Sequence, residues 1–140
     1  MIRRGSSADV VDVRWEVLRP GRPRETAIFP GDDAGFHWVD EEAGQVLAVA
    51  SVIPAPWPAE PLTPTSGLQL RGMAVSPAVR GTGRGAMLLV AIQRDLAAPL
   101  WCNARADVLG FYARFGWRVR GGPFDVPAVG PHHRMTWSPP

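Results

Sequence analysis

Apolar and polar residues alternate at several places along the chain, and the clearest case runs from Leu68 to Val75. Leu68 and Leu70 alternate with polar neighbours, as in a strand with one buried face. The alternation slips by one residue at Gly72 and is continued by Met73 and Val75. A slip of one residue at a glycine is typical of a β-bulge. This stretch is therefore predicted to be a bulged strand.

Strand and helix patterns alternate along the rest of the chain. Strands are predicted at residues 1–5, 36–39, 45–53, 99–103, 117–119, 124–126 and 134–137. Helices are predicted from Ser6 or Ser7 to Pro20, after Gly85, and over residues 108–115, the last with Asp107 as N-cap and Gly116 as its left-handed end. These elements predict an α/β fold with a mixed central sheet flanked by helices.

Two stretches between these elements are predicted to be turns or loops. The acidic stretch Asp40–Gly44 is interpreted as a solvated hairpin turn. Residues 54–64 are rich in proline and are interpreted as a long loop between strands, in which Trp57 and Leu62 favour burial.

The bulged strand ends at Pro77 and is followed by a glycine-rich turn, Arg80 to Gly85, that opens a helix. Backbone N–H groups at a helix N-terminus are free to bind an anion, and the alternate glycines let an anion approach. Arg80 and Arg84 add positive charge. The turn therefore predicts a ligand that carries phosphate. The next residues, Ala86 and Met87, exclude the Walker pattern, and the glycine spacing excludes the dinucleotide fingerprint.

Two motifs resemble those of the GCN5-related N-acetyltransferases (GNAT family). The R-x-x-G-x-G pattern from Arg80 to Gly85 resembles the loop that holds the pyrophosphate of acetyl-CoA. The string F-Y-A-R-F-G-W around Tyr112 resembles the family block Y-x-x-x-G-F, with Trp117 in place of Phe. The resemblance covers essentially the whole chain and implies one acetyltransferase domain, residues 1–140. It also implies that the strands of the sheet are splayed apart after the β-bulge.

The resemblance also implies roles for particular residues. Tyr112 would be the catalytic general acid that protonates the departing thiolate. The residues implied to bind acetyl-CoA are Met73, Ala74 and Val75 on the bulged strand, Arg80, Gly81, Thr82, Gly83, Arg84, Gly85 and Ala86 in the turn, and Asn103 or Arg105 near the pantetheine arm. The first helix and the loop after it would form one wall of the acceptor site.

The implied reaction is acetyl transfer to an amine by direct attack in a ternary complex. Many relatives place a glutamate on the bulged strand, where this chain has Gln69 and Arg71. The general base is therefore left open among His37, Asp33, Glu60, His132 and His133, with water as a relay. The alternative hypothesis is a non-catalytic acyl-CoA-binding or regulatory module on the same fold.

Composition excludes several other classes. All 15 basic residues are Arg, yet the formal net charge is only +2 and no basic run occurs, so nucleic acid is not an expected partner. No long apolar segment predicts a membrane span. The one cysteine, Cys102, lies in an apolar strand and is interpreted as a buried structural thiol in a cytoplasmic protein. The adjacent His132 and His133 would point to opposite faces of a strand, so no metal site is expected. The expected partners are acetyl-CoA and an unidentified amine, and the resemblance allows a homodimer.

Overall fold

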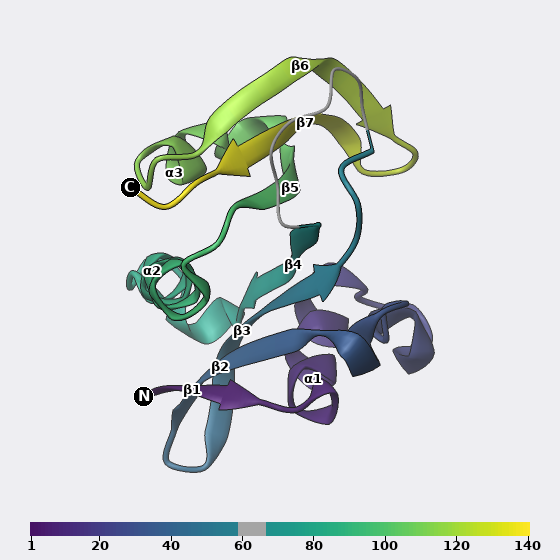
Figure 1. Ribbon diagram of the computed structural model, residues 1–140. Helices are drawn as coiled ribbons and strands as arrows, with labels where there is room; N and C mark the ends of the chain where they lie inside the picture. The colour runs from purple at the N-terminus through teal and green to yellow at the C-terminus, as the bar shows by residue number, and fades with distance from the viewer. Residues whose placement is uncertain (59–66) are drawn as a thin grey trace.

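Seven strands form one mixed sheet in the computed structural model of this chain, which describes residues 1–58 and 67–140 (Figure 1). The strands are β1 (Ile2–Gly5), β2 (Phe36–Glu42), β3 (Gln45–Pro54), β4 (Leu68–Val75), β5 (Leu100–Arg105), β6 (Arg118–Val126) and β7 (Gly130–Trp137). Their order in the sheet is β1-β2-β3-β4-β5-β7-β6. The β4–β5 pair is parallel, whereas the other neighbouring pairs are antiparallel. The prediction of a mixed sheet is confirmed.

Three α-helices accompany the sheet in the described ranges: α1 (Ser7–Leu18), α2 (Arg84–Leu96) and α3 (Leu109–Ala113). One-turn 3₁₀ helices lie at η1 (Arg24–Ala27), η2 (Asp32–Ala34), η3 (Pro77–Val79) and η4 (Ala106–Val108). Ser6 precedes α1, and its backbone N–H donates a hydrogen bond of 2.9 Å to the Asp9 carboxylate, as at a capping box. Within the described residues, no helix is both long and apolar enough to cross a bilayer.

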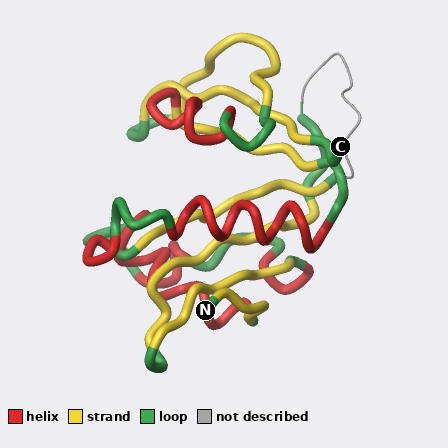
Figure 2. Tube along the Cα trace, turned by 90° about the vertical axis from the view of Figure 1, so that its left-hand side faces the viewer, coloured by secondary structure: helices red, strands yellow, loops and turns green. Residues whose placement is uncertain are grey.

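Helices α1 and α2 cover opposite faces of the sheet. Trp38 and its neighbour Val39 on β2 point to opposite faces because side chains alternate along a strand. Trp38 packs in the apolar cluster that includes α2, and Val39 packs in the cluster that includes α1. Figure 2 shows α2 lying along one face of the strands.

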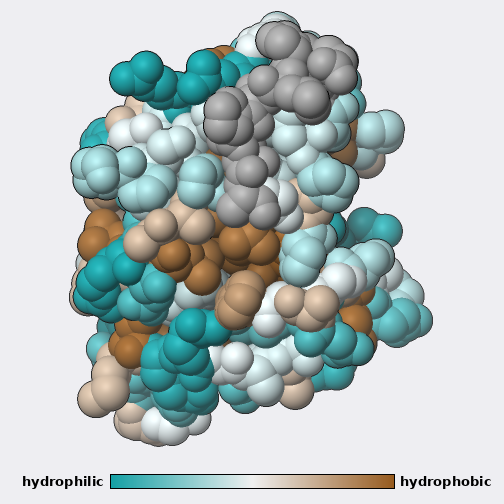
Figure 3. Space-filling view, viewed as in Figure 1, coloured by the Kyte–Doolittle hydropathy of each residue, from teal (hydrophilic) through white to brown (hydrophobic). Residues whose placement is uncertain are grey.

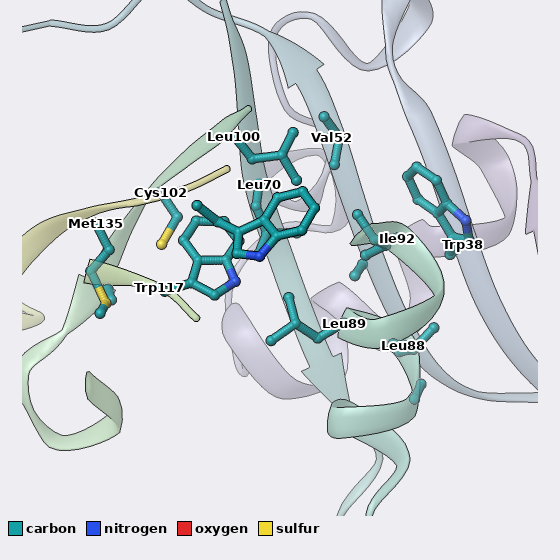
Figure 4. Packing of buried hydrophobic residues seen from close by; sticks show 14 residues of the cluster. Trp38, Val52, Leu70, Leu88, Leu89, Ile92, Leu100, Cys102, Trp117 and Met135 are labelled. Carbon is teal, nitrogen blue, oxygen red and sulfur yellow. The ribbon is translucent and has the colours of Figure 1, made fainter. Parts of the chain in front are cut away.

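The larger cluster joins both halves of the sheet on the α2 face. Its buried side chains come from α2, from β2 to β5, from β7 and from Trp117 just before β6, as Figure 4 shows for Ile92, Leu70, Trp38 and Met135. Burying apolar side chains of this size stabilises a fold by about 1.5–3 kcal/mol each. The helix predicted after Gly85 is thus confirmed, and its apolar stripe faces the sheet.

The register between β3 and β4 confirms the predicted bulge. Val49 lies opposite Ala74 and Ser51 lies opposite Arg71, so β4 carries one more residue than β3 across this interval. Gly72 lies within it and has φ +63°, a left-handed conformation that glycine adopts without steric cost. The bulge bends β4 near the middle of the sheet.

Strands β4 and β5 separate beyond a single paired position. Gln69 on β4 is the Cα partner of Trp101 on β5, and no other pair of these strands is in register within the described residues. The space-filling view shows hydrophobic residues gathered at the level of α2 and β4, with hydrophilic residues above and below (Figure 3). The splayed strands expected from the resemblance are therefore present.

Two predicted elements near the C-terminus need correction. The helix at 108–115 is shorter: η4 occupies its start, α3 begins after Val108, and Asp107 lies inside the 3₁₀ turn instead of capping the helix. The strands predicted at 117–119 and 124–126 form one strand, β6, because a register shift between Arg120 and Phe124 takes up the glycine-proline bend. Gly116 has φ +91°, so its left-handed conformation is confirmed.

The acidic stretch after Val39 is also only partly a turn. The turn itself is confined to Ala43 and Gly44, and the preceding residues belong to β2. Asp40 is 2% exposed and is therefore not solvated. The predicted loop at 54–64 is described only up to Pro58, and Glu60 and Leu62 lie outside the described residues. Trp57 packs edge-on against Trp101, with ring centroids 5.7 Å apart.

Candidate active site

A cavity of about 910 Å³ opens where β4 and β5 separate. Its wall includes the predicted residues Met73, Ala74, Val75, Arg80, Gly85, Asn103, Arg105 and Tyr112. Gly81, Thr82, Gly83, Arg84 and Ala86 do not line it. Residues of β4, the glycine-rich turn, β5 and α3 thus meet at one site, and its size is that of a ligand pocket.

The glycine-rich turn has open backbone at the N-terminus of α2. Gly81 and Gly83 have φ +77° and +85°, and a Cβ placed on either residue would meet no atom within 4 Å. Gly83 is the N-cap residue of α2. The Thr82 hydroxyl donates a hydrogen bond to the Val79 carbonyl and closes the turn. Because the first-turn N–H groups of a helix lack partners within the helix, this open turn can accept an anion.

The two arginines of the turn have different surroundings. Arg80 is exposed and lines the cavity, and its Nε donates to the Val75 carbonyl at 3.4 Å. Arg84 instead donates to the Asp40 carboxylate at 2.9 Å and to the Glu42 carboxylate at 3.0 Å. The expectation that both side chains add free positive charge to the turn is therefore corrected, because two carboxylates of β2 neutralise Arg84.

The bulge of β4 packs directly on buried side chains beneath the cavity. A Cβ on Gly72 would lie 2.8 Å from Arg14 Nε and 3.1 Å from the Phe29 ring. Arg14 is fully buried, and its guanidinium carbon lies 4.0 Å from the centroid of the Phe29 ring. Any side chain at residue 72 would thus clash with Arg14 and Phe29 and displace them from the strand.

A buried polar network continues from Arg14 into the sheet. Its guanidinium donates two hydrogen bonds to Asp32, of 2.7 and 3.0 Å, and one of 2.8 Å to the Ser51 hydroxyl. Ser51 contacts His37 Nδ1 at 2.7 Å, and His37 Nε2 contacts the Asp32 carbonyl at 2.9 Å. Burial alone would raise the pKa of Asp32, but hydrogen bonds from Arg14 and the Phe29 N–H hold it below its ordinary value.

Sequence reasoning missed this network. The available signal was that Arg14 follows Val10 by four residues, on the apolar face of α1. A buried arginine is stable only when it is paired, so this position implied a carboxylate partner elsewhere in the chain. Spacing alone could not identify that partner as Asp32.

Tyr112 lies on α3 against the cavity and within an aromatic cluster. Its ring packs edge-on against Phe111 and Trp117, with centroids 5.2 and 5.6 Å away. Burial raises the pKa of Tyr112, and the nearby Cys102 thiol raises it further. The phenol therefore stays protonated at neutral pH and can act as a proton donor.

The five candidate bases differ in whether they line the cavity. His132 lines the cavity, and its Nδ1 lies 2.8 Å from the Gly130 carbonyl. His37 belongs to the buried network, Asp33 and His133 do not line the cavity, and Glu60 lies outside the described residues. Cys102 is buried, and burial raises the pKa of its thiol, as expected of a structural cysteine. The described residues hold no group of three or more His, Cys, Asp or Glu able to bind a metal ion.

Comparisons with known proteins agree with this geometry. The model of the acetyltransferase (GNAT) domain matches residues 33–119. An uncharacterised N-acetyltransferase of Bacillus subtilis (strain 168), YitI, is 35% identical over 133 residues, which span 91% of this chain and 88% of the relative.

Two solved structures show the same fold. A Corynebacterium glutamicum protein, described as histone acetyltransferase HPA2 and related acetyltransferase, has a TM-score of 0.80 at 20% identity, covering all of this chain and 96% of its own. A GNAT acetyltransferase of Elizabethkingia anophelis with acetyl-CoA bound has a TM-score of 0.68 at 13% identity, covering 99% and 97%. The chain belongs to the GNAT family and is an acetyl-CoA-dependent N-acetyltransferase.

Proposed function

We propose that the enzyme transfers an acetyl group from acetyl-CoA to an amine by direct attack in a ternary complex, with Tyr112 as the general acid. One observation carries the proposal: Arg80 and Gly85 at the two ends of the glycine-rich turn, the free edge of β4 and Tyr112 all line one cavity. This arrangement supports binding of acetyl-CoA and proton donation within the same space. The single buried cysteine fits a reducing cytoplasm.

Two parts of the cavity wall, the glycine-rich turn and the edge of β4, suit the two ends of acetyl-CoA. The pyrophosphate would lie at the turn, on the N–H groups of residues 81–86 and near the Arg80 side chain. The pantetheine arm would follow Met73 to Val75, where β4 has lost its pairing with β5, and would hydrogen-bond as an added strand does. Asn103 and Arg105 border the same space from β5. The Elizabethkingia structure, with its bound acetyl-CoA, supports this assignment on the same fold.

The chemical step requires a neutral amine and a protonated leaving group. The amine lone pair attacks the thioester carbonyl carbon, a C–N bond forms, and the C–S bond breaks to release the CoA thiolate. Tyr112 gives its proton to the thiolate sulfur. The nitrogen loses its extra proton to a base and the tyrosinate is reprotonated, so that atoms and charge balance.

We propose His132 as that base, directly or through water. The Gly130 carbonyl can only accept a hydrogen bond, so in the neutral ring Nδ1 carries the hydrogen. Nε2 then keeps the lone pair that can take a proton. Of the five candidates, His132 is the described residue that borders the cavity.

The test is Tyr112→Phe, assayed by thiol release from acetyl-CoA over a panel of amines. We expect kcat to fall at least about tenfold, with an unchanged Kd for acetyl-CoA by calorimetry and an unchanged unfolding midpoint. Because Tyr112 is the chain's one tyrosine, a ¹³C label on its ring carbon Cζ reports its ionisation as a single NMR signal. We expect that signal to stay in the phenol form beyond the ordinary tyrosine pKa.

Two results would count against the proposal. Acetyl-CoA binding without turnover of any amine would support the non-catalytic module. Turnover that survives Tyr112→Phe unchanged would remove the acid role while leaving the transferase intact.

A further inference from the structure

The charged side chains on the cavity wall are all basic within the described residues. They are Arg19, Arg71, Arg80, Arg105 and Arg134, with His132 beside them and no Asp or Glu. Arg80 adjoins the glycine-rich turn, and Arg105 lies 3.4 Å from the Asp107 carboxylate. The positive charges of Arg19, Arg71 and Arg134 are not needed to bind the phosphates at the turn.

Arg71 and Arg19 lie, together with the buried Arg14, around one aromatic ring. The guanidinium carbon of Arg71 lies 4.4 Å from the centroid of Phe29, and that of Arg19 lies 5.4 Å from it. Arg71 is the residue immediately before Gly72 of the bulge, and Arg19 follows the end of α1. Both side chains are only partly exposed, and both line the cavity.

Neither arginine has a carboxylate partner among the described residues. Asp32, whose charge acts on Arg71, is already bound through both oxygens by Arg14. Arg19 donates one hydrogen bond, to the Leu18 carbonyl at 3.0 Å. Burial and the neighbouring arginines lower the pKa of both side chains, because the charged groups are partly withdrawn from water and lie near other cations. A bound anion would stabilise the two charges.

The phosphates of acetyl-CoA do not reach this pair in the proposed binding mode. Arg71 lies four residues before Val75, a distance of roughly 13 Å along a strand, and the phosphate-binding turn begins after Val75. The thioester end of the cofactor would lie near the bulge, between the turn and Arg71. The pair therefore faces the side from which the acceptor must come.

We propose that the acceptor is an amine that carries its own carboxylate or phosphate group, which Arg71 and Arg19 bind beside the bulge. Guanidinium groups match the two oxygens of such an anion through paired hydrogen bonds. The same positive field disfavours an ammonium ion, so it helps to present the acceptor as the neutral, nucleophilic amine. This substrate class rests on the acetyl transfer proposed above.

The test compares matched amines at one pH. The panel is 4-aminobutanoate, its amide, butylamine, and 3-aminopropylphosphonate, with thiol release as the assay. We expect kcat/KM for at least one acidic member to exceed that of the amide and of butylamine at least about tenfold, since a polar site rejects an analogue that lacks the matching group. Comparing 3-aminopropylphosphonate with 4-aminobutanoate shows whether the site prefers a phosphate-like group or a carboxylate. Equal rates for acid and amide would overturn the proposal.

Arg71→Gln and Arg19→Gln identify the binding site. Each is expected to lower kcat/KM for the acidic amine several-fold or more, to lower that for butylamine much less, and to leave the Kd for acetyl-CoA unchanged. Arg22→Gln is the matched control, because Arg22 is exposed and does not line the cavity. A loss that is the same for acidic and neutral amines would contradict the assignment, and two separate variants guard against one that fails to fold.

A binding measurement separates this proposal from the proposed function. The reaction product N-acetyl-4-aminobutanoate, and its phosphonate counterpart, are titrated calorimetrically into the CoA-loaded protein and into Arg71→Gln. Binding that needs Arg71, in a protein without turnover, would refute the transferase mechanism and keep the anion site. No binding of either anion, in a protein that acetylates neutral amines, would refute the anion site alone.

Discussion

Arg14 and Asp32 are joined by two hydrogen bonds, of 2.7 and 3.0 Å, in a place where their side chains are 0% and 3% exposed. Arg14 comes from α1, and Asp32 from the η2 turn that leads into β2. A further hydrogen bond of 3.0 Å runs from Arg14 to the Ala27 carbonyl. The pair thus attaches the first helix and its loop to the sheet, and Arg14 lies directly against the bulge that borders the cavity.

Asp32→Ala is expected to destabilise the protein strongly. The substitution leaves the Arg14 charge buried without its partner, which costs about 3–5 kcal/mol of unfolding free energy in comparable cases. Urea denaturation at neutral pH measures the change. The matched control is Asp12→Ala, because the Asp12–Arg24 pair is exposed and should contribute little. Equal effects of the two substitutions would contradict the structural role of Asp32.

The same pair predicts a pH dependence. The pKa of Asp32 is lowered in the folded state from an ordinary value of 3.8. The stability from this carboxylate is therefore fully present above about pH 3.8 and is lost as the pH falls through the lower, folded value. The difference in stability between the wild-type protein and Asp32→Ala should shrink on acidification. A difference that stays constant down to strongly acidic pH would contradict the ion pair.

Gly72→Ala is expected to damage both stability and acetyl-CoA binding. The new methyl group would clash with Arg14 Nε and Phe29, in addition to the strain of a left-handed residue, which is on the order of 1–3 kcal/mol. Gly44→Ala is the control: Gly44 also has positive φ, +78°, but a Cβ there meets nothing within 4 Å. Denaturation and calorimetric titration should show the larger loss for Gly72→Ala, and similar losses would mean that the close packing beneath the bulge matters little.

Arg80→Gln should weaken ligand binding, whereas Arg84→Gln should lower stability. Arg80 faces the cavity, so its loss should weaken acetyl-CoA several-fold and leave acetyl-pantetheine unaffected, because the latter lacks the pyrophosphate. Arg84 neutralises the buried Asp40, so its loss should mainly lower the unfolding midpoint. Calorimetry with both ligands and thermal unfolding measure the two effects. If Arg84→Gln weakened acetyl-CoA binding and Arg80→Gln lowered the unfolding midpoint instead, the proposed roles of the two side chains would be wrong.

Elements encoded by neighbouring residues were predictable from the sequence. The phase slip at Gly72, the turn before α2 and the left-handed Gly116 each depend on the conformational freedom of glycine and a few adjacent side chains. The start of α3 was not predictable in this way. Asp107 was predicted to cap the helix, but it lies in a 3₁₀ turn, where its carboxylate accepts a hydrogen bond from Arg105. Helix ends depend on such small differences in hydrogen bonding.

Within the candidate site, the sequence by itself determined the backbone features: a bulged strand, a glycine-rich helix start and an aromatic block with Tyr112, because local spacing specifies them. Only the tertiary structure decided which charges are paired. It buried Asp40 against Arg84, 44 residues away, and Asp32 against Arg14, and left Arg71 and Arg19 without a described carboxylate partner at the cavity. The energy of a charge depends on burial and on partners brought together by folding, and neither can be read from neighbours along the chain.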